Sequence, residues 1–321
     1  MRWKVLVSAP YFQPVIDRFR QVFEEHDIEL VLPKVNERMS ENELTEIIDD
    51  IDGVISGDDQ FTSRVFEKAK RLRVISKWGT GIDSIDQVAA KKFGVKVCNT
   101  PNAFTMPVAD SVMGYVLCFA RRIPWMDRDI RAKNWVKQMG VSLQEKTLGV
   151  IGVGDVGKAV VRRAIAFNMR VLGTDIVELP ADFLVETKIE VVTKEELLRQ
   201  ADFVSINCTL DKTSYHIIDS KAIGLMKSTA YLINTARGPL VDEKALVEAL
   251  RGQQIAGAAL DVFEQEPLPE GSPLREMDNC LLAPHNANSS PTAWERVHAS
   301  TLKNLLEGLG LPGAGLKRQY A

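Results

Sequence analysis

The sequence predicts an α/β protein made of two doubly wound parallel sheets. Short apolar runs alternate along the chain with longer segments of helical pattern, which is typical of parallel βαβ units. This alternation occurs twice, on either side of a long apolar segment of helical pattern at 108–123. The length of 321 residues also suits two domains. We therefore expect two separate sheets, each covered by helices.

The first series of predicted strands has five members, and helical patterns at 14–25 and 41–50 lie between them. The strands of this series are 5–7, 29–32, 53–55, 74–76 and 96–98. The second series has six members, the number in a full dinucleotide-binding sheet. Its strands are 148–151, 171–174, 203–206, 231–234, 256–262 and 280–283.

Two further helical patterns connect the series. The segment 108–123 follows a turn signal at 99–102, and we interpret it as a helix that crosses from one domain into the other. The segment 291–308 follows the last strand, and we expect it to return to the first domain.

The composition excludes several classes of protein. Hydrophobic residues make up 45% of the chain, charged residues 26%, and the formal net charge is −3, so neither a nucleic-acid surface nor a polybasic membrane anchor is expected. No apolar run reaches the roughly 18 residues of a membrane helix, and the N-terminus lacks the pattern of a signal peptide. The cysteines lie far apart, so we expect reduced thiols in a cytoplasmic protein, with no metal site. They are Cys98, Cys118, Cys208 and Cys280.

A glycine motif of the form GxGxxG directly follows the predicted strand at 148–151 and opens a helical pattern. In this context Gly152 permits a tight turn, and Gly154 lets the backbone approach a pyrophosphate. Gly157 lets the helix lie close to the strand. The N-terminus of the helix then presents its N–H groups to the phosphates. The motif alone is weak, because FAD and S-adenosylmethionine folds share parts of it.

An acidic residue stands where such a fold places one. Asp175 lies 18 residues after the last glycine of the motif, close to the expected spacing of about 20, and directly follows the strand at 171–174. Its carboxylate is expected to accept hydrogen bonds from the ribose hydroxyls of the adenosine. No Arg or Lys follows within Ile176, Val177 and Glu178 to receive a 2′-phosphate. The sequence therefore predicts NAD as the cofactor, in preference to NADP.

Polar groups suited to the chemistry of keto acids follow three of the later strands. Arg237, Glu266 and His285 come after the strands at 231–234, 256–262 and 280–283. A guanidinium pairs with a carboxylate through two hydrogen bonds, and an imidazole exchanges protons near neutral pH. A carboxylate beside that imidazole stabilises its charged form. A single histidine after a strand is more often structural, but these companions favour a catalytic interpretation.

With these residues in place, the chain resembles the D-isomer-specific 2-hydroxyacid dehydrogenases, the family that includes phosphoglycerate dehydrogenases and glyoxylate and hydroxypyruvate reductases. The resemblance covers about residues 50–310, and the motifs occur in the order that is usual in the family. The matching segments are 77–83 (KWGTGID), 108–110 (VAD), 148–157 (LGVIGVGDVG), 234–238 (NTARG), 259–267 (ALDVFEQEP) and 283–285 (APH).

The resemblance implies a role for each residue of the site. Arg237 would orient and polarise the substrate, His285 would act as general acid and base, and Glu266 would set its charge. Asp261 would hold the nicotinamide carboxamide, and backbone N–H groups at Thr80 and Gly81 would bind the substrate carboxylate. The remaining cofactor contacts would come from Asp155, Val156, Cys208, Thr235 and Ala236.

The resemblance also implies the domain plan and the partners. A Rossmann NAD-binding domain at 101–288 would be inserted into a flavodoxin-like substrate domain made of 1–100 and 289–321. The active site would lie in a cleft that closes on binding. The partner would be a small 2-keto or 2-hydroxy acid, and the chain would form a homodimer.

Several departures from the family pattern bear on the substrate. Asp110 stands where Glu is usual, Thr209 where Pro is common, and Asn286 and Asn288 follow the histidine. Asp58 and Asp59 lie in a loop where relatives that act on phosphorylated acids often carry Arg. They would either repel a phosphate or cap the next helix.

Three other side chains have weaker sequence signals. We expect Lys77 to be a solvated loop lysine, although contact with substrate is the alternative. Trp78 and Trp135 are expected to pack inside the protein.

Two alternative functions remain open at this stage. One is a non-catalytic protein that senses NAD(H) or serves as a scaffold, although such a protein need not retain the three catalytic residues. The other is oxidation of formate or phosphite. Formate enzymes of the family pair the histidine with Gln, so Glu266 argues against this second alternative.

Overall fold

The protein, described by a computed structural model over residues 2–312, forms two compact units. Unit 1 comprises Met1–Phe104 and Ser290–Ala321, and unit 2 comprises Thr105–Ser289. The boundaries predicted from the sequence lie close to these. The last residues of the predicted substrate domain, 313–321, lie outside the described residues.

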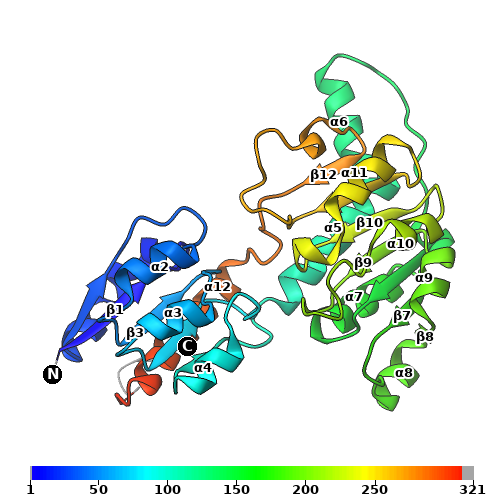
Figure 1. Ribbon diagram of the computed structural model, residues 1–321. Coiled ribbons are helices and arrows are strands. Elements are labelled where there is room, and N and C mark those ends of the chain that lie inside the picture. The colour runs from blue at the N-terminus through cyan, green and yellow to red at the C-terminus, as the bar shows by residue number, and fades with distance from the viewer. Residues whose placement is uncertain (1, 313–321) are drawn as a thin grey trace. The chain divides into compact units, whose positions relative to one another are not determined.

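Unit 1 is a parallel five-stranded sheet covered by helices (Figure 1). Its elements are β1 (Trp3–Val7), η1 (Gln13–Phe19), α1 (Arg20–Glu25), β2 (Ile28–Val31), α2 (Glu41–Ile47), β3 (Gly53–Ser56), α3 (Ser63–Lys68), β4 (Val74–Lys77), α4 (Gln87–Lys92), β5 (Lys96–Cys98) and α12 (Pro291–Gly308). The strand order β2-β1-β3-β4-β5 is the flavodoxin-like order.

The last long helix of the chain belongs to unit 1, as predicted. Helix α12 begins at the predicted residue, where Ser290 caps it by accepting a hydrogen bond from the N–H of Ala293. It lies against β3, β4 and β5, and Ser76 in β4 donates a buried 2.7 Å hydrogen bond to the carbonyl of Thr301. The two ends of the chain therefore build one domain.

Unit 2 is a parallel seven-stranded sheet with helices on both faces. Its elements are α5 (Thr105–Arg121), α6 (Ile123–Arg131), η2 (Leu143–Glu145), β6 (Thr147–Ile151), α7 (Asp155–Ala166), β7 (Arg170–Thr174), α8 (Ala181–Thr187), β8 (Glu190–Val191), α9 (Lys194–Gln200), β9 (Phe203–Ile206), α10 (Ser220–Leu225), β10 (Tyr231–Asn234), η3 (Gly238–Leu240), α11 (Glu243–Arg251), β11 (Gly257–Leu260), η4 (Pro273–Glu276) and β12 (Cys280–Leu282).

The strand order of unit 2 is β12-β11-β10-β9-β6-β7-β8, which contains the Rossmann arrangement. The prediction of six strands missed β8, because this strand has only two residues and both are exposed. Successive residues of the inner strands face opposite sides of the sheet. Leu232 packs in one apolar core with α9, α10 and α11, whereas Ile233 packs in the other with α5 and α7. The sheet is thus buried on both faces, as expected for parallel strands.

Two predicted helices differ in detail. The helix predicted at 108–123 ends at Arg121, because Arg122 takes a left-handed conformation (φ 57°). The separate helix α6 then begins at Ile123, with Pro124 in its first turn. The segment 14–25 begins as the tighter helix η1 before α1. The tighter winding brings Ile16 and Phe19, three residues apart, onto one buried face.

Among the described residues, none of the helices has the length and apolar character required to cross a membrane.

Candidate active site

The glycine motif forms a tight turn between β6 and α7, and each glycine meets a different environment. Gly152 has φ +84°, and a Cβ there would lie 2.5 Å from the backbone nitrogen of Cys208. A Cβ on Gly157 would lie 2.1 Å from the carbonyl oxygen of Gly152. A Cβ on Gly154 would meet nothing within 4 Å. Two glycines are therefore required by the protein's own packing, and the third faces open space.

Asp175 closes this turn from the neighbouring strand. It directly follows β7, and its carboxylate accepts hydrogen bonds from the N–H of Val153 (2.6 Å) and the N–H of Val177 (3.0 Å). Asp155 is exposed and Val156 is half-buried at the start of α7. Asp175 therefore lies at the glycine turn, where the dinucleotide motif requires an acidic residue.

The remaining predicted cofactor residues follow the next strands of the sheet. Cys208 comes after β9, and burial raises the pKa of its thiol to about 11. Thr235 directly follows β10 and is 8% exposed, and its buried hydroxyl oxygen has no hydrogen-bond partner among the described residues. An unpartnered buried hydroxyl is costly and requires an explanation. The open space at Gly154 and this hydroxyl both fit a dinucleotide bound along this edge of the sheet.

The loop that carries Arg237 is held by a residue to which sequence reasoning gave no role. Asn234, the last residue of β10, is fully buried. Its side-chain amide donates to the carbonyl of Arg237 (2.8 Å), and its side-chain oxygen accepts from the N–H of Ala236 (3.1 Å). The guanidinium of Arg237 donates to the carbonyl of Ala236 at 2.8 Å. The position of Asn234 in the NTARG motif was the available signal, but a buried asparagine at a strand end has no distinctive sequence pattern.

Glu266 and His285 form a direct pair in unit 2. The carboxylate oxygen Oε2 of Glu266 lies 2.9 Å from Nδ1 of His285, and Oε1 accepts from the N–H of Phe263 at 2.9 Å. The side chains are 18% and 21% exposed, respectively. His285 has φ +52°, a conformation that side chains other than glycine rarely adopt. Such local strain is common where a side chain must be aimed at a site.

Asp261 anchors the segment that carries His285. Asp261 is 1% exposed, and its two carboxylate oxygens accept from the N–H groups of Asn286 and Ala287, each at 2.8 Å. Its backbone carbonyl accepts from the N–H of His285 at 2.7 Å. The pKa of Asp261 is raised, mainly because its carboxyl group is buried. The expected contact with the carboxamide remains a prediction, and the structure adds this anchoring role.

The backbone groups predicted to bind the substrate carboxylate lie in unit 1, in the loop after β4. Gly79 has φ +124°, and its carbonyl accepts from the N–H of Thr100 at 2.8 Å. The carbonyl of Thr80 accepts from the side-chain amide of Asn99. Within residues 2–312, the N–H groups of Gly79, Thr80 and Gly81 have no hydrogen-bond acceptor. Carbonyls turned inward and N–H groups without acceptors make a backbone site suited to a carboxylate.

The substrate loop after β3 differs from both sequence interpretations. Asp59 is fully buried, and its carboxylate accepts from Ser8, Ser56 and two backbone N–H groups. It therefore neither faces a phosphate nor caps α3, which begins after Thr62. Asp58 lies 3.1 Å from Nζ of Lys77. The expectation that Lys77 is solvated is wrong, because its side chain is only 4% exposed.

The two tryptophans have different environments. Trp78 is 5% exposed and contacts Tyr11, Trp294 and Phe104, which confirms a packing role. Trp135 is 88% exposed, so the packing role predicted for it is wrong. It lies in a segment without regular structure after α6, where hydrophobic character does not indicate burial.

The other histidines lie outside the group formed by Glu266 and His285. His298 is 2% exposed in α12, where its Nδ1 accepts a hydrogen bond from the indole N–H of Trp78 at 3.0 Å. His216 lies 2.7 Å from Glu264, and Nδ1 of His26 lies 2.8 Å from the carbonyl oxygen of Val22. Each therefore has a structural partner in its own surroundings.

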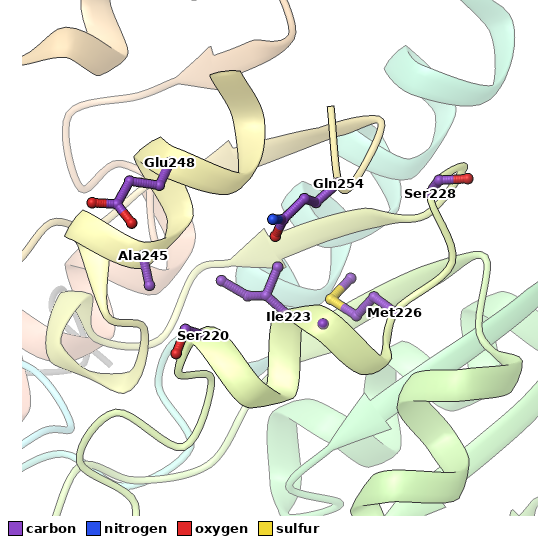
Figure 2. Close-up of a pocket in the computed structure, with 8 residues that line it drawn as sticks. Ser220, Ile223, Met226, Ser228, Ala245, Glu248 and Gln254 are labelled. Carbon is purple, nitrogen blue, oxygen red and sulfur yellow. The ribbon is translucent and has the colours of Figure 1, made fainter. Parts of the chain in front are cut away.

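A hollow of about 500 Å³ lies on unit 2 between α10 and α11 (Figure 2). Ile223 and Met226 line it, and the polar side chains of Ser220, Glu248 and Gln254 surround it. None of the predicted site residues lines this hollow. The hollow is therefore separate from the predicted site residues at the strand ends.

Comparison with known proteins identifies the family of this chain. A family model described as D-isomer specific 2-hydroxyacid dehydrogenase, NAD binding domain, matches residues 113–287, which lie within unit 2. A glyoxylate reductase from Korarchaeum cryptofilum is 39% identical over 290 residues, covering 88% of this chain and 87% of the relative. A D-3-phosphoglycerate dehydrogenase from Methanocaldococcus jannaschii is 38% identical, covering 95% of this chain and 58% of the relative.

Solved structures show the same architecture. The D-lactate dehydrogenase from Aquifex aeolicus, solved in complex with NAD and lactic acid, is 27% identical with a TM-score of 0.85. The match covers 96% of this chain and 97% of that one. The chain belongs to the D-isomer specific 2-hydroxyacid dehydrogenase family and is an NAD-dependent oxidoreductase of that family.

Proposed function

We propose that this enzyme transfers a hydride between NAD(H) and C2 of a small 2-keto or 2-hydroxy acid, with His285, Glu266 and Arg237 as its catalytic residues. The observation that carries the proposal is the 2.9 Å contact between Glu266 and Nδ1 of His285. This contact leaves Nε2 as the nitrogen that exchanges a proton with the C2 oxygen of the substrate. The carboxylate of Glu266 stabilises the imidazolium, which is the form required for reduction.

Arg237 supplies the positive charge that a keto acid requires. A guanidinium binds a carboxylate through two hydrogen bonds and lowers the energy of the negative charge that develops on the carbonyl oxygen. The clamp by Asn234 holds the backbone from which this side chain extends. The N–H groups at Thr80 and Gly81 in unit 1 are proposed to bind the same class of carboxylate.

The cofactor residues fit NAD in kind and in position. When bound, NADH supplies the hydride that reduces C2. Gly154 provides open space for the pyrophosphate, and the N-terminus of the twelve-residue helix α7 favours its negative charge. Asp175 is proposed to accept hydrogen bonds from the ribose hydroxyls, and Thr235 to use its unpartnered hydroxyl toward the cofactor. Asp155, Val156, Cys208, Ala236 and Asp261 are proposed as further contacts.

The choice of substrate within the family is open to direct measurement. Repulsion of a phosphate by two neighbouring carboxylates loses its basis, because Asp59 is buried and the charge of Asp58 is offset by Lys77. We therefore propose the class of small 2-keto acids without excluding a phosphorylated member.

The test is NADH oxidation with glyoxylate, hydroxypyruvate, pyruvate and 3-phosphohydroxypyruvate. His285→Ala should lower kcat by about 10²–10⁴ while the Kd for NADH changes little, because general acid catalysis is lost and cofactor contacts remain. His298→Asn is the matched control, since His298 is a buried histidine of unit 1 and its replacement should leave kcat near the wild-type value. Unchanged turnover in His285→Ala would refute the assignment. Tight NADH binding without turnover of any acid would instead support a sensor or scaffold.

The proposed assembly is a homodimer formed through unit 2. The segment after α6 exposes Trp135 by 88%, Val136 by 61% and Met139 by 94%. Clustered exposed apolar side chains mark interaction surfaces, and a second copy of the chain is the partner that the family resemblance implies. We expect Met139→Lys together with Trp135→Ser to convert a dimer into a monomer in light scattering, whereas the exposed control Val185→Lys should not. A monomeric wild-type chain would refute the proposal.

A further inference from the structure

An ion pair between a buried lysine and a half-buried aspartate lies at the carboxyl edge of the sheet in unit 1. Lys77 is the last residue of β4, and its side chain is only 4% exposed. Its Nζ lies 3.1 Å from Oδ1 of Asp58 and donates to the carbonyl of Trp78 at 3.1 Å. Asp58 follows the neighbouring strand β3, and its side chain is 34% exposed. A lysine this deeply buried is rare, and its charge acts in surroundings that screen it poorly.

The charge of Lys77 lies directly beside the predicted carboxylate site. Its Nζ is 3.7 Å from the position that a Cβ on Gly79 would occupy. Nζ also holds the carbonyl of Trp78 through a hydrogen bond of 3.1 Å. Together with the bonds to the carbonyls of Gly79 and Thr80, three successive carbonyls in this loop are held by protein donors. The ammonium therefore both shapes the loop and adds positive potential to it.

We propose that Lys77 is a positioning residue for the substrate carboxylate, and that Asp58 limits how strongly its charge attracts anions. The inference rests on the proposed function, in which Thr80 and Gly81 bind that carboxylate. The low exposure of Lys77 means that it acts through the loop and through its field, without being a direct ligand. The carboxylate of Asp58 offsets the charge of Lys77, so the site attracts a substrate with additional negative charges less strongly than a lysine without this partner would.

The test compares the KM of three variants, which differ in the charge that remains at the ion pair. Lys77→Met leaves Asp58 negative, Asp58→Asn leaves Lys77 positive, and the double variant leaves neither. The KM for a monoanionic keto acid should rise about tenfold in Lys77→Met and fall several-fold in Asp58→Asn, with the double variant between wild type and Lys77→Met. The kcat of Lys77→Met should stay within about threefold of wild type, because Lys77 is not proposed to transfer a proton. The gain in Asp58→Asn should be larger for 3-phosphohydroxypyruvate, which carries more negative charge.

A purely structural role for the pair predicts a different outcome. Breaking a buried ion pair is destabilising whichever partner is removed, so Lys77→Met and Asp58→Asn would then both raise KM. Lys77→Arg, which keeps the charge, should retain near wild-type KM and serves as the variant of choice if Lys77→Met folds poorly. The matched control is the exposed pair of Lys4 and Asp50, 2.6 Å apart in the same unit, whose neutralisation should leave KM unchanged.

Binding of oxamate to the enzyme–NADH complex separates this inference from the proposed function. Oxamate carries the carboxylate but is not reduced, so its Kd should follow the same order as KM. If wild type turns over keto acids and binds oxamate, but Kd and KM are the same in all charge variants, the role of Lys77 is refuted and the proposed function stands. If wild type neither binds oxamate nor reduces any keto acid while NADH binds, the proposed function fails first.

Discussion

Gly154 and Gly157 lie three residues apart in one turn, and adding a methyl group to each should have opposite consequences. At Gly157 the new Cβ would lie 2.1 Å from the carbonyl oxygen of Gly152, and real Cβ atoms essentially never approach closer than 3.0 Å. Backbone must therefore shift by about 0.9 Å at the centre of the turn. Overpacking of this kind costs about 1–3 kcal/mol. For a domain of the size of unit 2, each kcal/mol lowers Tm by about 2–4 °C.

At Gly154 the new Cβ meets no protein atom within 4 Å. Gly154 is the N-cap of α7, and alanine is a poorer N-cap than glycine by up to about 1 kcal/mol, so Gly154→Ala should lower Tm by no more than about 4 °C. The methyl group instead occupies the space proposed for the pyrophosphate. We expect the Kd for NADH to rise at least about tenfold, a loss of about 1.4 kcal/mol of binding free energy.

The assay is thermal unfolding with and without NADH, together with a fluorescence titration of NADH. Wild type should gain about 2.7 kcal/mol of stability at a ligand concentration of 100 Kd, and Gly154→Ala should lose about half of that gain at the same concentration. Gly224→Ala is the control, because a Cβ on Gly224 would also meet nothing within 4 Å, but this glycine lies in α10. Gly154→Ala with wild-type affinity would refute the location of the pyrophosphate. Gly157→Ala with wild-type Tm would refute the packing argument.

Other contacts in the two units lead to three more expectations. Glu266→Gln should lower kcat for keto-acid reduction, because the imidazolium of His285 loses its carboxylate partner. The alkaline limb of the pH profile of kcat should then move to lower pH, and an unchanged profile would contradict this expectation. Asp175→Ala should raise the KM for NADH and reduce the discrimination against NADPH, which is measured by kcat/KM with each cofactor. Retained discrimination would show that another group excludes the 2′-phosphate. Burial lowers the pKa of His298 below its ordinary value of 6.5. Its contribution to stability is therefore present above that value and is lost as pH falls through the lowered folded-state pKa. His298→Asn, which keeps an acceptor for Trp78, should flatten the acid side of a plot of Tm against pH, and an equally steep plot would assign the effect to another group.

The residues proposed for the chemical site could be predicted from the sequence, because their positions follow from the fold class. Parallel strands end at one edge of a sheet, so side chains that follow β10, β11 and β12 collect there whatever the details of the helices. The spacing of the glycines also depends only on local structure, because a strand, a tight turn and a helix follow one another within six residues. The alternation of apolar runs similarly predicted both sheets, apart from the short exposed strand β8.

The environments of charged and apolar side chains were decided only by the tertiary structure. Asp58 and Asp59 are adjacent in sequence, yet one pairs with Lys77 and the other is buried among donors from β3 and the segments after β1 and before α2. Trp78 and Trp135 are the same residue type, and one is buried while the other is 88% exposed. Burial and charge pairing depend on which distant segments meet, and these contacts have no signature in local sequence. The sequence by itself determined the family, the fold class and the strand ends at which the site is proposed, whereas only the folded chain decided which charges are paired and which surfaces remain uncovered.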